Sequence, residues 1–161
     1  MLRSILILFT MLALCGLLLA QVSGVSGDSP ALPPGVIDGS KTPGLIPDQA
    51  AFRLVFLSLA VPPSPDNKAL ARQEAFLKKI GLSDADKTTL KRALVTFAAN
   101  HAVWQQNLAA NITGGSPELL AQGWVIVKNT RDLLTNELTT DGNSKLIQYV
   151  TLAKLHMRVV P

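Results

Sequence analysis

This chain of 161 residues has a single cysteine, Cys15, which lies within an apolar stretch near the N-terminus. Downstream of that stretch the chain has no thiol, which excludes an internal disulfide, a cysteine nucleophile and a thiolate metal site. A domain without these links is held by its apolar core. About 115 residues suffice for that, since a domain of this size buries roughly two-thirds of the surface that its unfolded chain exposes.

Charged and aromatic residues are also scarce. Asp, Glu, Lys and Arg together make up 16% of the chain, Phe, Trp and Tyr make up 5%, and the net charge is +4. So weak a positive charge does not give the concentrated basic surface of a nucleic-acid-binding protein, and aromatic residues do not alternate with basic ones as single-strand binding requires. We therefore predict that nucleic acid is not a ligand.

The motifs of common catalytic and metal sites are missing as well. Metal sites on helices use Glu-x-x-His or His-Glu-x-x-His, and neither pattern occurs in the sequence. A Gly-x-Ser-x-Gly nucleophile turn is also missing, and Gly114-Gly115 lacks the lysine and the spacing of a phosphate-binding loop. We predict no catalytic residue, no metal site and no cofactor.

The first twenty residues have the pattern of a secretory signal peptide. Arg3 gives a positive start, residues 4–20 are almost entirely apolar, and Ala20 or Gly24 offers a small residue for cleavage. We therefore predict an exported protein, either periplasmic or secreted. The alternative is an uncleaved membrane anchor over residues 4–20, because this stretch approaches the shortest length that spans a bilayer, roughly 17 residues.

Residues 21–46 are predicted to be a disordered linker. They contain Pro30, Pro33, Pro34 and Pro43 among many glycines and serines, so neither a helical nor a strand period persists. Little apolar surface is available there to offset the entropy lost on ordering. The chain is thus divided into a signal peptide (1–20), a linker (21–46) and one domain (47–161).

The domain over residues 47–161 is predicted to be all-α. Apolar residues recur at helical spacing between capping residues and Gly or Pro breaks, although the first run is short enough for a strand to be the alternative. Short connections favour antiparallel neighbours, so we predict an up-and-down bundle of four to five unequal helices. Asn111, at the end of the third predicted helix, begins a glycosylation sequon. The segment Asp141-Gly142-Asn143 is expected to break the chain before the fifth helix. The predicted helices cover residues 48–60, 64–80, 83–111, 116–138 and 144–159.

The longest predicted helix carries a narrow seam of large side chains. The seam steps by three or four residues, which keeps all its members on one side of a helix. We expect the first helix and the helix with Trp124 to cover it. The seam consists of Leu90, Leu94, Phe97, His101, Trp104 and Leu108.

Five side chains are candidates for lining a ligand site. Arg53 is the only charged residue in the apolar run 49–61. When buried, it needs a carboxylate, helix C-terminal carbonyls or a bound acidic ligand as its partner. His101 is interpreted as a neutral core imidazole, or else as a proton acceptor or ligand in an apolar pocket. Such a pocket would be lined by Phe97, His101, Trp104 and Trp124, and Trp124 is expected on the buried face of its helix.

A second set of candidates is basic. These residues lie close together in sequence near the ends of two successive predicted helices. They form either an ordinary solvated face or a patch that contacts anionic lipid, glycan or an acidic protein. The set consists of Arg72, Lys78, Lys79, Lys87, Lys91 and Arg92.

The leading functional hypothesis is an exported, non-enzymatic helical protein that binds a protein or a component of the cell envelope. It follows from the leader, the helical periods and the missing catalytic motifs. The alternative is a carrier of a small molecule or lipid, with an apolar cavity near His101 and Trp104. The third hypothesis is an enzyme that uses His101 with Arg53 or an acid from another helix. Contact with a membrane is expected only through an uncleaved leader or weak electrostatic attraction.

Overall fold

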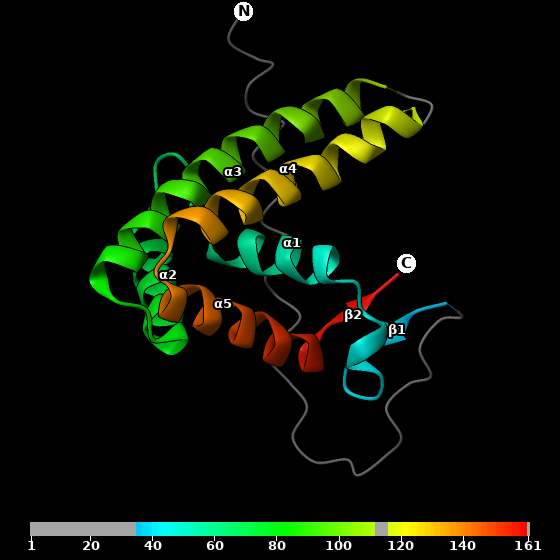
Figure 1. Ribbon diagram of the computed structural model, residues 1–161. Coiled ribbons are helices and arrows are strands. Elements are labelled where there is room, and N and C mark those ends of the chain that lie inside the picture. The colour runs from blue at the N-terminus through cyan, green and yellow to red at the C-terminus, as the bar shows by residue number, and fades with distance from the viewer. Residues whose placement is uncertain (1–34, 112–115, 161) are drawn as a thin grey trace, which may run out of the picture. The chain divides into compact units, whose positions relative to one another are not determined.

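The computed structural model describes residues 35–111 and 116–160 and is mainly helical, which confirms the all-α class (Figure 1). The predicted signal peptide and the first part of the predicted linker lie outside these residues. Across the described ranges, no helix combines the length and the apolar character needed to cross a membrane. The helices are α1 (Asp48–Leu59), α2 (Asn67–Ile80), α3 (Asp84–Ala110), α4 (Pro117–Glu137) and α5 (Thr140–Ala153).

Local capping signals place the two longest helices. The Ser83 side chain accepts a hydrogen bond from the backbone N–H of Asp86 at the start of α3, and Ser116 accepts one from Leu119 at the start of α4. Each bond satisfies an N–H that the first turn of a helix leaves free. Gly81 ends α2 with φ of 78°, a left-handed conformation that glycine adopts at no steric cost.

Three predicted helix boundaries were wrong. α2 begins at Asn67 rather than at Ser64, because the Asp66 side chain accepts from the backbone N–H of Ala69 and caps the helix there. α5 begins at Thr140, so the segment Asp141-Gly142-Asn143 lies inside the helix instead of breaking it. α5 also ends at Ala153, and a short 3-10 helix, η2 (Lys154–His156), follows it.

The buried carboxylate of Asp86 explains the early start of α5. It accepts bonds from the Thr139 backbone N–H at 2.9 Å, from the Thr139 hydroxyl at 2.8 Å and from the Ser83 hydroxyl at 2.7 Å. A Cβ atom at Gly142 would lie 2.5 Å from Asp86 Oδ2, so only glycine leaves room for the carboxylate. These bonds connect the starts of α3 and α5, and they lower the pKa of Asp86, chiefly through the Thr139 N–H.

Residues 35–46, which we assigned to the linker, contain regular structure in part. β1 (Ile37–Asp38) pairs antiparallel with β2 (Arg158–Val159), and a 3-10 helix, η1 (Pro43–Leu45), precedes the buried Ile46. The Lys154 ammonium donates to the Ile46 carbonyl at 2.8 Å and to Asp48 Oδ1 at 2.7 Å. The folded part of the chain therefore includes residues before position 47, held by partners more than a hundred residues away.

The core lies where α1 packs against the N-terminal half of α3, the C-terminal half of α4 and one face of α5 (Figure 1). Leu77 and Ile80 at the end of α2 complete it. α3 and α4 lie side by side as a long pair. The C-terminal half of α3 and the N-terminal half of α4 extend beyond α1. The largest fully buried side chains are Ile46, Phe56, Leu59, Leu77, Leu90, Leu94, Phe97, Val127, Leu134 and Leu146.

Candidate functional site

The five side chains predicted to line a ligand site do come together, from α1, α3 and α4. The rings of Phe97 and His101 are 5.5 Å apart, and those of His101 and Trp104 are 5.1 Å apart. The Arg53 guanidinium carbon lies 4.9 Å from the centre of the Trp104 ring and 5.9 Å from that of Trp124. Both distances are within the range of a cation–π contact, which extends to about 6 Å.

Trp104 is fixed by its neighbours on α4. Its indole Nε1–H donates to the Leu119 carbonyl at 2.7 Å, and its ring lies directly on Gly123. A Cβ atom at residue 123 would come within 2.6 Å of Trp104 Cζ2, so this close approach of α3 and α4 depends on glycine. The side chain is buried, and it holds the two helices together at the point where they leave the core.

His101 is a core residue with one polar neighbour. It is 3% exposed, and its Nε2 lies 3.4 Å from Arg53 Nη2. A guanidinium only donates hydrogen bonds, so Nε2 is the acceptor and the imidazole is neutral. Burial and the nearby Arg53 charge lower the pKa of His101, while a hydrogen bond with Gln105 opposes this shift. His101 does not line any of five surface hollows that lie among the described residues.

Arg53 has neither of the two internal partners that we considered for it. No carboxylate in residues 35–111 and 116–160 forms an ion pair with it, and its nearest polar contact is the long one to His101. Its Nε is buried without a hydrogen-bond partner in the same ranges. The guanidinium instead lies against two indole rings, and Arg53 as a whole is partly exposed to solvent, with no anion of the described chain beside its charge.

Trp124 was predicted on the buried face of α4, and this was wrong, because 41% of the residue is exposed. The buried stripe of α4 is Gly123, Val127, Thr130 and Leu134, which steps by four, three and four residues. Trp124 lies one position beside this stripe, at its edge. It therefore covers Arg53 from outside instead of entering the core.

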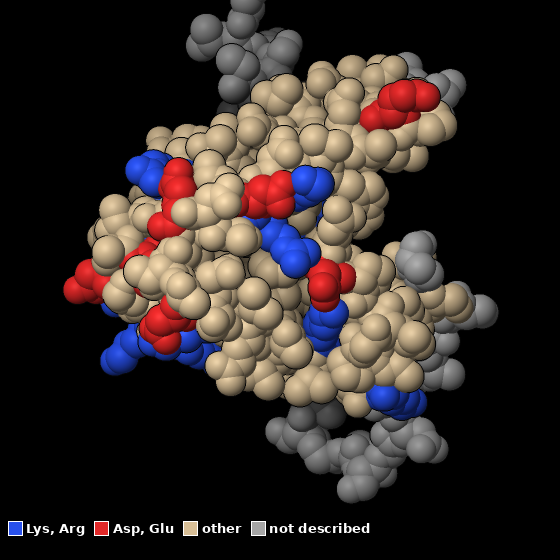
Figure 2. All heavy atoms as spheres, in the orientation of Figure 1, with Lys and Arg blue, Asp and Glu red and all other residues tan. Residues whose placement is uncertain are grey.

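The distal part of α3 and α4, which we call the arm (residues 93–111 and 116–127), is almost without charge. Glu118 is the only Asp, Glu, Lys or Arg between Arg92 and Lys128. In Figure 2 the surface of this arm, at the upper right, shows no blue and a single red patch near its tip. The arm nevertheless exposes large apolar side chains at Val95, Val103, Leu120, Trp124 and Val125.

The predicted basic set does not form one patch of uncompensated charge. Lys87 pairs with Asp84 at 2.9 Å, Lys91 pairs with Glu74, and Arg92 pairs with Glu137. Blue and red side chains accordingly alternate over this part of the surface in Figure 2. The other three members, Arg72, Lys78 and Lys79, are exposed on α2 and have no ion pair within the described chain.

Sequence reasoning missed the exposed apolar residues around Arg53. α1 exposes Leu54 and Leu57, one and four residues beyond Arg53, and α4 exposes Leu120, one turn before Trp124. For Leu120 the signal was present in the sequence, as the run of 35 residues with one charge between Arg92 and Lys128. Leu54 and Leu57 lie outside that run, in the apolar run 49–61 that we expected to cover the seam. No group of three or more His, Cys, Asp or Glu side chains in the described ranges is arranged to hold a metal ion.

Comparisons with protein-family models, with curated proteins and with solved structures find no match to this chain.

Proposed function

We propose that the chain is an exported, non-enzymatic binding protein, and that its binding surface is formed by the arm together with Arg53. The single observation that carries this proposal is the guanidinium of Arg53, which forms no ion pair within the described residues and lies beside Trp104 and Trp124 at the base of the nearly uncharged arm. The proposal also includes an N-terminal signal peptide over residues 1–20 and an up-and-down order of the helices in the bundle.

Composition supports a protein partner for this surface. Central parts of protein interfaces are depleted in charged residues and enriched in Trp and Arg, and such residues dominate binding energies. The arm adds exposed valines and leucines to this pair, together with Asn100, Asn107 and Gln122 around a hollow of about 270 Å³ beside Trp104. Amides of this kind can bond to peptide groups of a partner without the cost of removing a charge from water.

Electrostatics adds a requirement on the partner. A partly buried guanidinium that has no carboxylate partner among residues 35–111 and 116–160 attracts one from outside, and Arg is suited to bidentate contact with carboxylates. We therefore expect the partner to insert an acidic side chain or a C-terminal carboxylate over Arg53, with apolar residues around it. The carrier and enzyme alternatives receive less support at this place, since Phe97, His101 and Trp104 are all buried against one another.

Site-specific photo-cross-linking in the native host tests this proposal. A photoreactive phenylalanine analogue would replace Leu120 or Val103, which are 49% and 56% exposed on the arm. The matched control is the same replacement at Lys68, an exposed residue of α2. We expect one discrete protein adduct, the same from both arm positions and missing from position 68. No adduct from the arm, or an equal adduct from position 68, would contradict the proposal.

A further inference from the structure

A second surface, separate from the arm, carries an independent inference. α2 and α5 border a groove of about 520 Å³ whose residues come from α2, α5 and η2. Phe76 and Lys79 line it from α2, while Tyr149, Leu152, Ala153 and His156 follow one another along α5 and η2 at steps of three, one and three residues. This spacing puts the latter four on one side of the helix, over a length of about 10 Å.

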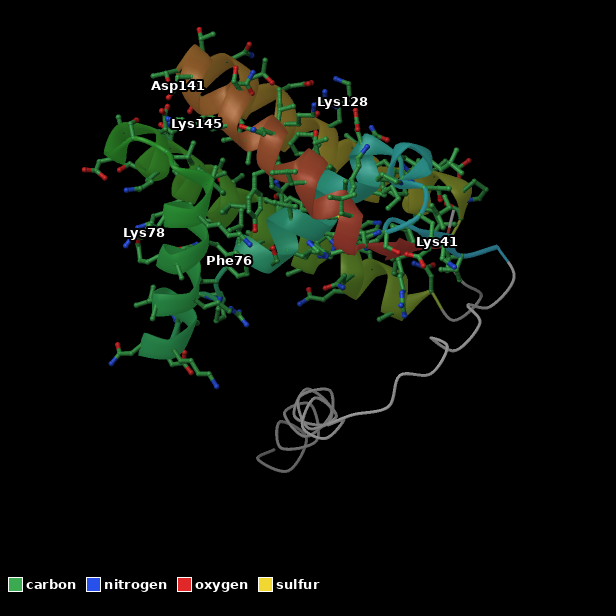
Figure 3. The ribbon with its side chains drawn as sticks, turned by 90° about the horizontal axis from the view of Figure 1, so that it is seen from below. Lys41, Phe76, Lys78, Lys128, Asp141 and Lys145 are labelled. Atoms are coloured by element: carbon green, nitrogen blue, oxygen red, sulfur yellow. The ribbon has the colours of Figure 1, made fainter. Side chains whose placement is uncertain are left out.

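The two sides of α2 differ in this region. In Figure 3, Phe76 points from α2 toward the rest of the domain, whereas Lys78 points away from it. Leu152 and Leu155 are both exposed along the groove, so apolar side chains line a space that other described residues do not fill. Pockets for small ligands commonly have volumes of roughly 300–1,000 Å³, a range that includes this groove.

Each polar side chain that lines the groove can donate a hydrogen bond. Lys79 contributes an ammonium, His156 has at least one ring N–H in either protonation state, and Tyr149 has a hydroxyl whose pKa is raised by burial. None of the described residues that line the groove is acidic. Three acids of the described chain lie near lining residues in sequence, share a hollow with one or pair with a neighbour of one. Glu74 pairs with Lys91, Asp48 pairs with Lys154, and Asp38, which lines a neighbouring hollow together with His156, accepts two bonds from Ser40.

From this arrangement we propose that the groove binds a single-chain anionic amphiphile, such as the carboxylate of a fatty acid. The hydrocarbon chain lies over Phe76, Ala153 and Leu152, and the carboxylate accepts bonds from Lys79 and His156. Charge complementarity selects this ligand, because the charged side chain among the described lining residues, Lys79, is cationic, and an apolar trough of this kind favours an anionic head and disfavours a cationic one. The inference does not depend on the proposed role of the arm.

Titration calorimetry on the full chain tests this assignment. The probes are dodecanoate and dodecyltrimethylammonium, which have the same chain length and opposite head charge, each kept below its micelle concentration. We expect dodecanoate to bind at least tenfold more tightly than the cationic probe. Methyl resonances of Leu152 and Ala153 should shift on addition of dodecanoate, whereas those of Val103 and Val125 on the arm should not.

Exposed positions supply variants that leave the fold intact. Leu152→Glu adds a negative charge to the groove and should weaken dodecanoate binding at least tenfold, while Leu152→Gln should weaken it less. Lys79→Gln should weaken dodecanoate and not the cationic probe, and Lys78→Gln on the opposite side of α2 should change neither. Equal binding of the two probes, no binding of dodecanoate at about 1 mM, or an unchanged affinity in Leu152→Glu would overturn the assignment.

Discussion

At the scale of single residues, the two tryptophans of the chain have different roles although both contact Arg53. Trp104 is buried, donates a hydrogen bond to α4 and lies against Gly123. Trp124 lies at the edge of α4 with much of its ring in water. The first stabilises the fold, and the second is available to a partner.

Substitution of each tryptophan separates these roles. Trp104→Ala should lower the free energy of unfolding by about 3–5 kcal/mol, because it opens a large cavity in the core. Trp124→Ala should lower it by about 1 kcal/mol or less, since the residue is at the surface and loses mainly one cation–π contact. Urea unfolding followed by circular dichroism measures both. Equal losses would show that the two side chains are equally important for packing.

His101 gives a prediction about pH. Its pKa in the folded state is lowered, first by burial and then by Arg53, so the unfolded chain binds more protons to this residue below its ordinary pKa of 6.5. Stability should therefore rise with pH between the lowered pKa and 6.5 and should be lost as the pH falls through that window. In Arg53→Met the NMR-detected pKa of His101 should move up, but not fully to 6.5, because burial persists. An unchanged pKa would mean that Arg53 does not act on His101.

At the scale of secondary-structure elements, two glycines set how closely helices approach. Gly123 allows the Trp104 ring to lie on α4, and Gly142 leaves room for the Asp86 carboxylate at the start of α5. At both positions a methyl group would lie within 2.6 Å of a side chain that is itself buried. The arm and the connection between α3 and α5 both depend on these contacts.

Addition of one methyl group at residue 123 tests the first contact. Gly123→Ala should destabilise the fold by about 1–3 kcal/mol through overpacking, even though alanine favours helices more than glycine does. Gly44→Ala is the control, since a Cβ atom there meets nothing within 4 Å and should change stability by less than about 0.5 kcal/mol. Thermal unfolding measures both. A more stable Gly123→Ala would show that the ring can move away at little cost.

Asp86 connects elements that are far apart in the chain. Asp86→Ala should cost about 2–3 kcal/mol, because a charged acceptor of several bonds is lost and the Thr139 N–H is left without its partner. The lowered pKa means that this contribution is present above the unfolded pKa of 3.8 and is lost as the pH falls through the folded value. Asp84→Ala is the matched control, since Asp84 is solvent-exposed and bonds mainly to Lys87. Urea unfolding at neutral and acidic pH compares them, and equal effects of the two variants would contradict a connecting role for Asp86.

At the scale of the whole molecule, the sequence predicted what depends on neighbours in the chain. The helical class, the end of α2 at residue 80 and the starts of α3 and α4 near residues 83 and 116 follow from patterns a few residues long. The alignment of Phe97, His101 and Trp104 along one side of α3 followed from the spacing of the seam, whereas the contact of Arg53 with His101 and Trp104 did not. Each of these predictions uses local spacing or one exceptional residue in an otherwise regular helix.

What could not be predicted depends on distant partners. The pairing of Ile37 with Val159 and the burial of Ile46 arise from contacts over more than a hundred residues, and composition around the prolines indicated only disorder. Gly142 resembles a helix breaker until Asp86 is placed against it. Trp124 and Leu120 lie so close to the buried stripe of α4 that periodicity does not separate the face toward the core from the face toward solvent.

The central claim is that the arm and Arg53 supply the binding energy for a partner. The most direct measurement is the cross-linking yield from position 120 in the host, compared between the otherwise native chain, Arg53→Gln and Trp124→Ala, with unfolding curves recorded for each. We predict that either substitution lowers the yield at least tenfold, in keeping with an interface hot spot, while each variant stays folded. An unchanged yield in both folded variants would contradict the claim.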